Sequence, residues 1–357
     1  MPQIAGGSQS STHELAQKLI ERGHEVSVLA GIYHKDLVGY RTRLRLRLFG
    51  RGFVRDTLPG YPTYRRWFVW DDPADVLKAV RPNVVLVTSG YPFRTAKAFA
   101  AAGTPLAVYL RDVEFHKLGG DPRDLPDDTV YLANSEFTGA KYRDVFGIDP
   151  IAVPPFVLAS KYAADTVDPR NVTFINPHPL KGRDIAFDVA ERCPDIPFVF
   201  VEAWPLDAEQ QRINAARQKA APNVTIAPRT RDMRSVYAKA RVLLVPSQWE
   251  EAWGRIASEA HCSGVPVVAS AHGGLVESVG EGGVLIAPDA PIDDWVAAVR
   301  RLWDDDTYHA AMSKAARRYA ERPELQEERQ IGNVVDALTR AVERYSTAAG
   351  RPAVASA

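Results

Sequence analysis

Short apolar runs alternate with longer amphipathic runs along most of the chain. The apolar runs are rich in valine, and most of them lack polar residues at every second position. This pattern is typical of strands that helices cover on both faces. The predicted strands are, in chain order, HEVSVLA, NVVLVTS, PLAVYLRD, TVYLANS, NVTFINP, PFVFVEA, NVTIAP, ARVLLVPS, VPVVAS and GGVLIAP. The repeated alternation of strand and helix predicts an α/β fold with two doubly wound parallel sheets.

The length of 357 residues suits two domains of about 150–200 residues each. The first is predicted over residues 1–157 and the second over 171–325, with a polar linker containing proline over 158–170. A helix over 326–345 is expected to pack back on the first domain. The small and polar residues 346–357 are expected to form a disordered tail.

The first helix carries a local start signal. Ser11 and Glu14 have the S-x-x-E spacing of a capping box, and Gly23 is expected to end the helix. In a doubly wound sheet a central strand should precede this helix, but only Met1–Pro2 and a glycine-containing stretch do so. We therefore expect the first central strand, about ten N-terminal residues of a longer natural chain, to be missing from this sequence.

Charge and composition exclude several classes of protein. With 44 basic and 44 acidic residues the formal net charge is zero, so a nucleic-acid partner is not expected. Neither a secretory signal nor an apolar run of about 20 residues is visible. The two cysteines, Cys193 and Cys262, fit a reducing cytosol better than a disulfide framework or a zinc site. High alanine and arginine content suggests a bacterial source, and a cytoplasmic location is expected.

The segment PSQWEEAWGRIASEAHCSG begins at the end of a predicted strand and contains a short predicted helix. Ligands of parallel sheets bind beyond the carboxyl ends of strands and at helix N-termini. The amides of Trp253, Gly254 and Arg255 could therefore bind a diphosphate. Glu259 could then accept hydrogen bonds from a ribose diol, and Glu251 could reach sugar hydroxyls. The alternative is a solvated helix with a capping carboxylate.

Extended by VPVVASAHGGLVESV, this segment resembles the glutamate–seven–glutamate signature of family 4 retaining glycosyltransferases. GGSQSSTHELAQKLIERGHEVSVLAG resembles their N-terminal loop and first helix. YLANSEFTGAKY and VPPFV resemble the end of their first domain, and NPHPLKGRDIAFDVA the start of their second. The resemblance covers Gly6 to about Tyr345 and implies the GT-B architecture, in which two Rossmann-like domains face each other.

The resemblance implies a role for each matching residue. Glu251 would contact the transferred sugar and Glu259 the ribose, while the amides of residues 253–255 would hold the diphosphate. Lys181, in LKG, would be a phosphate cation. Gly6 and Gly7 would approach the diphosphate from the facing domain; the alternative is a flexible turn before a helix.

Other candidates follow from strand ends alone. Gly273 and Gly274, after the strand VPVVAS, would close the sugar pocket. Arg229, after another strand, could flank the nucleotide or simply face solvent.

The sequence departs from the family pattern at two positions. Asn176 stands where family members usually carry an arginine, so one phosphate cation is missing; Arg183 and His178 are the candidates to replace it. Arg111 stands where a histidine is common. Arg111, Asp112 or His116 could line the acceptor side, with a loop salt bridge or a structural histidine as the alternatives.

Six arginines lie between Arg41 and Arg55. In an extended chain the alternation of RLRLRL would place its arginines on one side. We favour a solvated edge strand protected by charge, with weak contact to anionic membrane lipids as the alternative.

Together these features predict a retaining glycosyltransferase that moves a sugar from a nucleoside-diphosphate sugar, with UDP or GDP as the nucleotide, to an unidentified acceptor. Three classes of acceptor stay open, namely a small molecule, a glycan and a lipid-linked compound, and peripheral contact with the inner membrane face is considered. No cofactor is expected, and no metal, because no Asp-x-Asp pair lies near the proposed phosphate site. The alternatives are a catalytically silent nucleotide-binding protein and, less favoured, a dehydrogenase.

Overall fold

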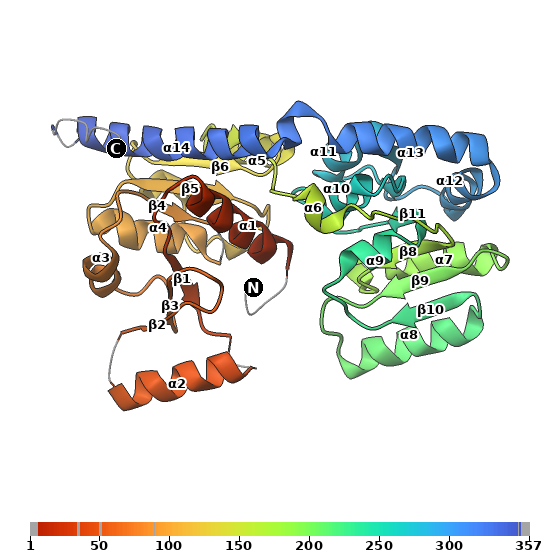
Figure 1. Ribbon diagram of the computed structural model, residues 1–357, viewed down its shortest axis with the longest axis horizontal. Coiled ribbons are helices and arrows are strands. Elements are labelled where there is room, and N and C mark those ends of the chain that lie inside the picture. Colours follow the sequence, from red (N-terminus) through yellow and green to blue (C-terminus); the bar gives the residue numbers. More distant parts are fainter. Residues whose placement is uncertain (1–5, 34–35, 50–51, 89, 349, 351–357) are drawn as a thin grey trace. The chain divides into compact units, whose positions relative to one another are not determined.

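The structure, a computed structural model, describes residues 6–33, 36–49, 52–88, 90–348 and 350. The chain forms two compact units (Figure 1). Unit 1 combines the residues up to Phe156 with those from Glu327 onward, and unit 2 runs from Val157 to Gln326.

Unit 2 contains a six-stranded parallel sheet in the order β10-β9-β8-β11-β12-β13. Its strands are β8 (Asn171–Ile175), β9 (Phe198–Val201), β10 (Val224–Ala227), β11 (Ala240–Val245), β12 (Val267–Ser270) and β13 (Gly283–Ile286). Its helices are α6 (Ala159–Tyr162), α7 (Arg183–Arg192), α8 (Ala208–Ala220), α9 (Met233–Tyr237), α10 (Arg255–Cys262), α11 (Leu275–Val279), α12 (Ile292–Asp304) and α13 (Asp306–Ala320). Short 3-10 turns lie at η3 (Pro179–Lys181), η4 (Gly280–Gly282) and η5 (Pro323–Leu325).

Both faces of this sheet are buried, as the unbroken apolar strands predict. Along β11, Val242 and Leu244 join a cluster on one face, whereas Leu243 and Val245 join the cluster on the other. Successive side chains of a strand point to opposite faces, so a strand covered twice must be apolar throughout. Trp295 of α12 closes the first cluster and Leu275 of α11 the second.

The described residues of unit 1 form two sheets where the sequence predicts one. The first has the order β1-β3-β2 and the second the order β4-β5-β6-β7. All pairs are parallel except β2 with β3. Among the described residues no strand pairs with both β1 and β4. The strands are β1 (Val28–Gly31), β2 (Val54–Asp56), β3 (Thr63–Arg66), β4 (Val85–Val87), β5 (Leu106–Leu110), β6 (Val130–Ala133) and β7 (Ile151–Ala152).

The helices of unit 1 come from both ends of the sequence. They are α1 (Gly7–Glu21), α2 (Leu37–Phe49), α3 (Ala74–Val80), α4 (Pro92–Ala101), α5 (Glu136–Phe146) and α14 (Glu327–Ala348), with 3-10 turns η1 (Phe115–Lys117) and η2 (Pro122–Asp124). Helix α14 packs along β5 and β6, as Figure 1 shows. Its Ile331 and Val334 share one core with Leu15 and Leu19 of α1 and with Tyr109 of β5.

Two predicted boundaries differ from the structure. Helix α1 begins at Gly7 with Gly6 as N-cap, so Ser11 and Glu14 are buried in its interior and form no capping box. Ser11 and Glu14 are three residues apart, like the ends of a capping box, because both lie on the side of the helix that faces the core. Helix α14 continues through Ser346 to Ala348, beyond the start of the predicted tail; residues 349 and 351–357 of that tail lie outside the described residues.

The prediction of an edge strand in the arginine-rich run is wrong, because residues 37–49 form helix α2. Asp36 caps this helix, since its Oδ1 accepts a hydrogen bond from the Gly39 amide at 2.7 Å. Leucine and arginine are both good helix formers, so the alternating pattern did not require an extended chain. Residues 50–51 of the run lie outside the described residues. None of the helices in the described part of the chain is both long enough and apolar enough to cross a bilayer.

Candidate functional site

The sheet of unit 2 reverses its strand order between β8 and β11. From β8 the chain builds outward through β9 to β10, and from β11 it builds the other way through β12 to β13. Ligands of doubly wound sheets bind beyond the carboxyl ends of the strands at such a reversal. The loop after β8 carries Lys181, and the loop after β11 carries Glu251.

These two side chains form an ion pair. Lys181 Nζ lies 2.6 Å from Glu251 Oε1, and the side chains are only 15% and 18% exposed. Ser247 Oγ donates to the same carboxylate oxygen at 3.2 Å. The ammonium also lies over the ring of Trp204, 4.6 Å from its centroid. The structure therefore brings together two residues that are 70 positions apart and that the sequence predicted to bind different parts of one donor.

The backbones of the two loops are joined directly. The amides of Gln248 and Trp249 both donate to the carbonyl of Leu180, at 3.0 and 2.9 Å. Gly182 follows in the left-handed region at φ 78°, and a Cβ there would overlap the carbonyl of Pro246. Only glycine allows this approach. The position of Lys181 against Glu251 is thus set by the backbone as well as by charge.

Helix α10 begins beside this pair. Its N-cap is Gly254 at φ 87°, which has no side chain to cap the helix. The indole of Trp253 turns inward: it is 4% exposed and its Nε1 donates to Ser258 Oγ at 3.1 Å. Arg255 is the first residue of the helix. The start of α10 carries the positive end of the helix dipole, which suits an anionic ligand.

Glu259 is buried within α10 and has protein partners on both oxygens. Oε1 accepts from Arg255 Nε at 2.7 Å, and Oε2 accepts from the Tyr237 hydroxyl at 2.9 Å. The Arg255 guanidinium also donates to the Tyr162 hydroxyl at 2.7 Å. Burial, together with the Glu259 charge, raises the pKa of Tyr237 well above its usual value, so the phenol stays protonated and donates. Each carboxylate oxygen can accept a further bond, so contact with a ribose stays a prediction.

Gly273 and Gly274 support the Glu251 loop. The Gly274 amide donates to the Glu251 carbonyl at 2.7 Å. A Cβ on Gly273 would press on that carbonyl, and one on Gly274 would overlap the carbonyl of Ala252. Arg229 is exposed after edge strand β10, which β9 separates from β8.

Asn176 has a structural role of its own. It adopts the left-handed conformation at φ 72°, is 5% exposed, and its Oδ1 accepts from the Trp204 amide at 3.2 Å. The proposed substitutes for the missing arginine are engaged elsewhere. The Arg183 guanidinium donates to Asp184 and Gln210. Burial and the nearby Lys181 lower the pKa of His178, which disfavours the protonated, cationic imidazole. Lys181 is therefore the cation that this loop holds beside Glu251.

In unit 1, Arg111 does not form the loop salt bridge considered for it with Asp112 or Glu114. Its guanidinium donates to the Ser8 carbonyl at 3.0 Å and to Thr12 Oγ1 at 2.7 Å, and it stacks over Tyr109. The arginine thereby ties the start of α1 to the end of β5. Gly6 and Gly7 form that start, and the Gly6 carbonyl accepts from Ser10 N at 2.9 Å.

Asp112 and His116 are exposed after β5. Asp112 Oδ1 accepts from the Glu114 amide at 2.8 Å, and partial desolvation raises the pKa of its carboxyl. The His116 side chain is 74% exposed, with Nε2 3.8 Å from Glu114 Oε1. Neither residue lines the pocket of unit 1 described next.

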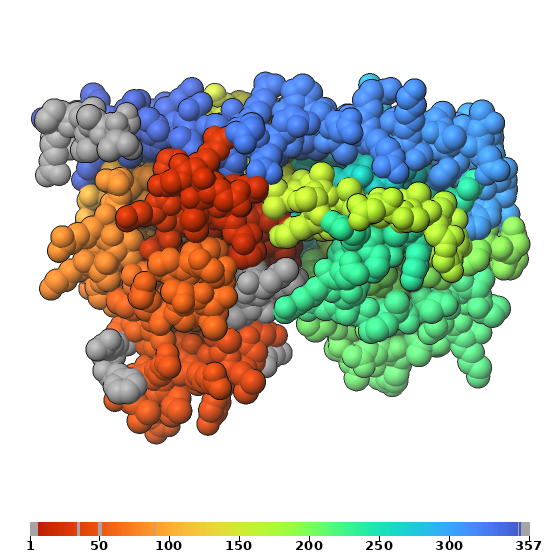
Figure 2. Space-filling model, viewed as in Figure 1, coloured from red at the N-terminus to blue at the C-terminus, as the bar shows by residue number. Residues whose placement is uncertain are grey.

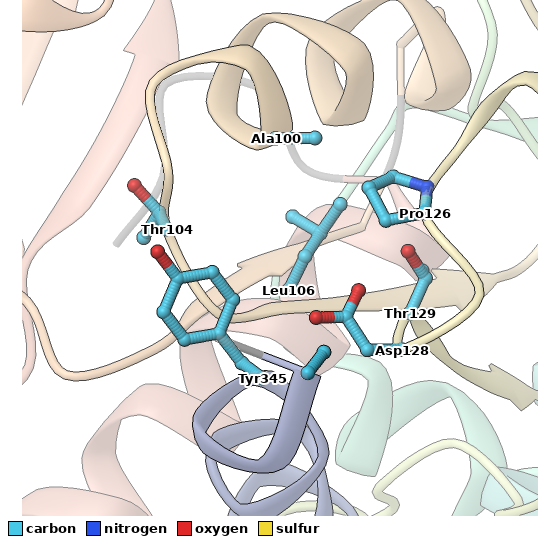
Figure 3. Close-up of a pocket in the computed structure, with 8 residues that line it drawn as sticks. Ala100, Thr104, Leu106, Pro126, Asp128, Thr129 and Tyr345 are labelled. Carbon is cyan, nitrogen blue, oxygen red and sulfur yellow. The ribbon is translucent and has the colours of Figure 1, made fainter. Parts of the chain in front are cut away.

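A pocket of about 240 Å³ does exist in unit 1, between α14 and the sheet (Figure 3). It lies at Leu106 and Thr129, the starts of β5 and β6, and Tyr345 of α14 closes one side. Substrates of such sheets bind at the opposite, carboxyl edge of the strands. The pocket therefore lies at the amino ends of the strands, away from the edge at which the predicted chemistry would take place.

Sequence reasoning missed three contributors to the site in unit 2. Trp204 follows β9 at its carboxyl end, so the same strand-end rule could have found it. The same rule could have found Ser247, which follows the end of β11. Tyr237 gave no signal in the sequence, because its contact with Glu259 depends on packing between α9 and α10.

Comparisons with protein families match both halves of the chain. Residues 180–319 match the family model of glycosyl transferases group 1, and residues 5–157 match that of Glycosyltransferase Family 4. Among curated relatives, the D-inositol 3-phosphate glycosyltransferase of Corynebacterium kroppenstedtii is 40% identical over 100 residues, covering 27% of this chain and 22% of the relative. The corresponding protein of Corynebacterium urealyticum is 32% identical over 158 residues, covering 40% and 37%. The alignments thus span well under half of these relatives.

Solved structures share the fold over nearly the whole chain. Sucrose-phosphate synthase from Thermosynechococcus elongatus superposes with a TM-score of 0.74 at 15% identity, covering 97% of this chain and 94% of that one. Anabaena HepE in complex with UDP-glucose superposes with a TM-score of 0.71 at 16% identity, covering 95% and 98%. The chain therefore has the GT-B fold, and its two halves resemble, in turn, glycosyltransferases of family 4 and of group 1.

Proposed function

We propose that this protein is a retaining glycosyltransferase that transfers a sugar from a nucleoside-diphosphate sugar without a bound metal. The observation that carries the proposal is the shielded Lys181–Glu251 pair at the strand-order reversal of unit 2. Solved structures of Anabaena HepE with UDP and with UDP-glucose support a donor of this class. UDP or GDP is the proposed nucleotide.

In this proposal, binding of the donor separates Lys181 from Glu251 and gives each side chain a new partner. A diphosphate is a stronger anion than one carboxylate, so it takes over the Lys181 ammonium. Glu251 then turns to the hydroxyls of the sugar, where a carboxylate is a good acceptor. The amides of Trp253, Gly254 and Arg255 at the start of α10 bind the diphosphate, and Glu259 binds the ribose. Gly273 and Gly274 hold the Glu251 loop in place, and Arg229 flanks the nucleotide.

The proposed chemistry needs no nucleophilic side chain. The bond between the anomeric carbon and the phosphate oxygen breaks, and Lys181 and the positive end of α10 stabilise the charge that develops on the diphosphate. The acceptor hydroxyl attacks the same face of the sugar and gives its proton to the leaving phosphate oxygen. This route retains the anomeric configuration. Gly6, Gly7, Asp112 and His116 of unit 1 are proposed to complete the diphosphate and acceptor sides, in a protein of the bacterial cytoplasm.

One observation favours a second candidate, a protein that binds the nucleotide but transfers nothing. Asn176 occupies the position of a usual phosphate cation and bonds to Trp204 instead. A site with one cation fewer stabilises the leaving diphosphate less. Such a protein would still bind a nucleoside diphosphate through unit 2.

Thermal shifts with UDP, GDP, ADP, dTDP and NAD test the donor site first. A ligand at a hundred times its dissociation constant adds about 2.7 kcal/mol, which corresponds to roughly 5–11 °C for units of this size. A shift with one nucleoside diphosphate supports the site, and no shift with any of the five contradicts both candidates. Release of labelled sugar from the corresponding donor then separates the two, because a silent binder shifts but releases none.

A further inference from the structure

Helix α2 has an exposed apolar stripe. Leu37, Tyr40, Leu44 and Leu48 are 75%, 59%, 46% and 66% exposed. Their spacing of three or four residues places them on one side of a helix, along roughly 16 Å. Thr42, on the opposite side, is only 3% exposed. Figure 1 shows α2 at the rim of unit 1 beyond β2 and β3, and Figure 2 shows this part of unit 1, in orange, on the surface.

Four arginines flank the stripe on both sides. At 100° per residue, Arg41 and Arg45 lie on one side of it and Arg43 and Arg47 on the other. The helix contains no acidic residue, although the whole chain has zero net charge. Among the described residues none of the four arginines forms an ion pair. The next strand adds the exposed Arg55.

We propose that α2 docks unit 1 on the surface of an anionic lipid bilayer. Its leucines enter the boundary between headgroups and acyl chains, and its arginines bind lipid phosphates. An apolar stripe with basic residues along both edges is the pattern of helices that lie in the membrane interface. Arginine suits this position because the aliphatic part of its side chain packs on apolar groups, while its guanidinium forms bidentate hydrogen bonds with phosphate.

The charges argue against the other occupants of this face. In a two-fold dimer through α2 the same four arginines would meet their own copies, and like charges face to face are repulsive. A soluble phosphate compound would use the arginines but would leave the leucines in water. An anionic bilayer binds the arginines through its phosphates and covers the leucines with its acyl chains. This proposal does not depend on the proposed glycosyl transfer.

The test is co-sedimentation of the full chain with vesicles of phosphatidylcholine, alone or with about one third phosphatidylglycerol. Binding is expected only with the anionic vesicles and should weaken with salt. Arg45→Gln with Arg47→Gln should lower the partition constant roughly 20- to 30-fold, since each basic residue contributes about fivefold. Leu44→Gln with Leu48→Gln should lower it about tenfold or more.

Matched controls keep the result specific. Leu58→Gln removes an equally exposed leucine, 66% exposed, and Arg340→Gln with Arg344→Gln removes two exposed arginines of α14. Neither control should change binding. The proposal is overturned if the wild-type chain ignores anionic vesicles, or if the leucine variants bind as well as wild type. It is also overturned if wild type forms a dimer that only the α2 variants lose.

Discussion

At the scale of single residues, Lys181 is the side chain whose removal should act most selectively. Lys181→Ala is expected to weaken binding of a nucleoside diphosphate at least tenfold while leaving the nucleoside alone nearly unaffected, because the proposed partner of the ammonium is the diphosphate and not the base. Isothermal titration of both ligands measures this. Lys239→Ala, an exposed lysine of the same unit, is the matched control. Equal losses for nucleoside and diphosphate would contradict the assignment.

Glu259 should show two separable effects. Glu259→Ala leaves Arg255 buried without its carboxylate and is expected to cost about 3–5 kcal/mol of unfolding free energy. Glu259→Gln keeps the shape of the side chain but would remove the charge from the proposed bonds to a ribose diol, so nucleoside affinity should fall about tenfold. Tyr237→Phe removes only the hydroxyl that donates to Glu259 from within the protein. If all three variants bind nucleoside like wild type, Glu259 is structural only.

His261 should make unit 2 sensitive to mild acid. Burial is the main cause that lowers its pKa to about 3, so the folded chain keeps it neutral in a range where the unfolded chain protonates it near pH 6.5. The unfolded state thus binds more protons, and stability should fall by up to about 1.4 kcal/mol per pH unit between pH 6.5 and 3. Melting temperatures at pH 7 and pH 5 should differ less in His261→Gln than in wild type. His24→Gln, at an exposed position, should leave the difference unchanged.

At the scale of elements, the turn between β8 and α7 depends on Gly182. Gly182→Ala combines a left-handed backbone with a Cβ that overlaps the Pro246 carbonyl, so both loops must separate. We expect a loss of about 2–5 kcal/mol, together with loss of nucleotide binding. Gly147→Ala has a similar φ of 72° but open space around its Cβ, and it measures the backbone cost alone. Equal effects in chemical denaturation of the two variants would show that the contact with Pro246 is unimportant.

At the scale of the whole molecule, the last helix returns to unit 1. Lys18 Nζ pairs with Glu327 Oε1 at 2.7 Å, and Ile331 is 1% exposed in the core that α14 shares with α1. Ile331→Ala should lower the unfolding free energy of unit 1 by about 2–5 kcal/mol, or its melting temperature by roughly 4–20 °C. The stabilisation that a nucleoside diphosphate confers on unit 2 should persist. Thr339→Ala, at an exposed site of α14, should change neither; a loss of nucleotide binding in Ile331→Ala would contradict this separation.

Local pattern predicted the strands well because burial on both faces leaves a purely apolar run. Each predicted strand has a counterpart in the structure, whereas the short β2, β3 and β7 were not predicted. The alternation RLRLRL was misleading, since leucine and arginine suit a helix as well as a strand. The Ser11–Glu14 spacing misled for a similar reason: a three-residue step recurs inside any helix.

The sequence by itself determined the class of fold and the order of the ten predicted strands, because those depend on short-range patterns of apolar and polar residues. From the same patterns it predicted the loops after β8 and β11 as the place for a ligand. Only the tertiary structure decided which side chains meet. It paired Lys181 with Glu251, gave Glu259 its partners Arg255 and Tyr237, and turned Arg111 toward the start of α1. Most of these contacts join residues far apart in the chain, and their formation depends on strand order and packing that no local pattern records.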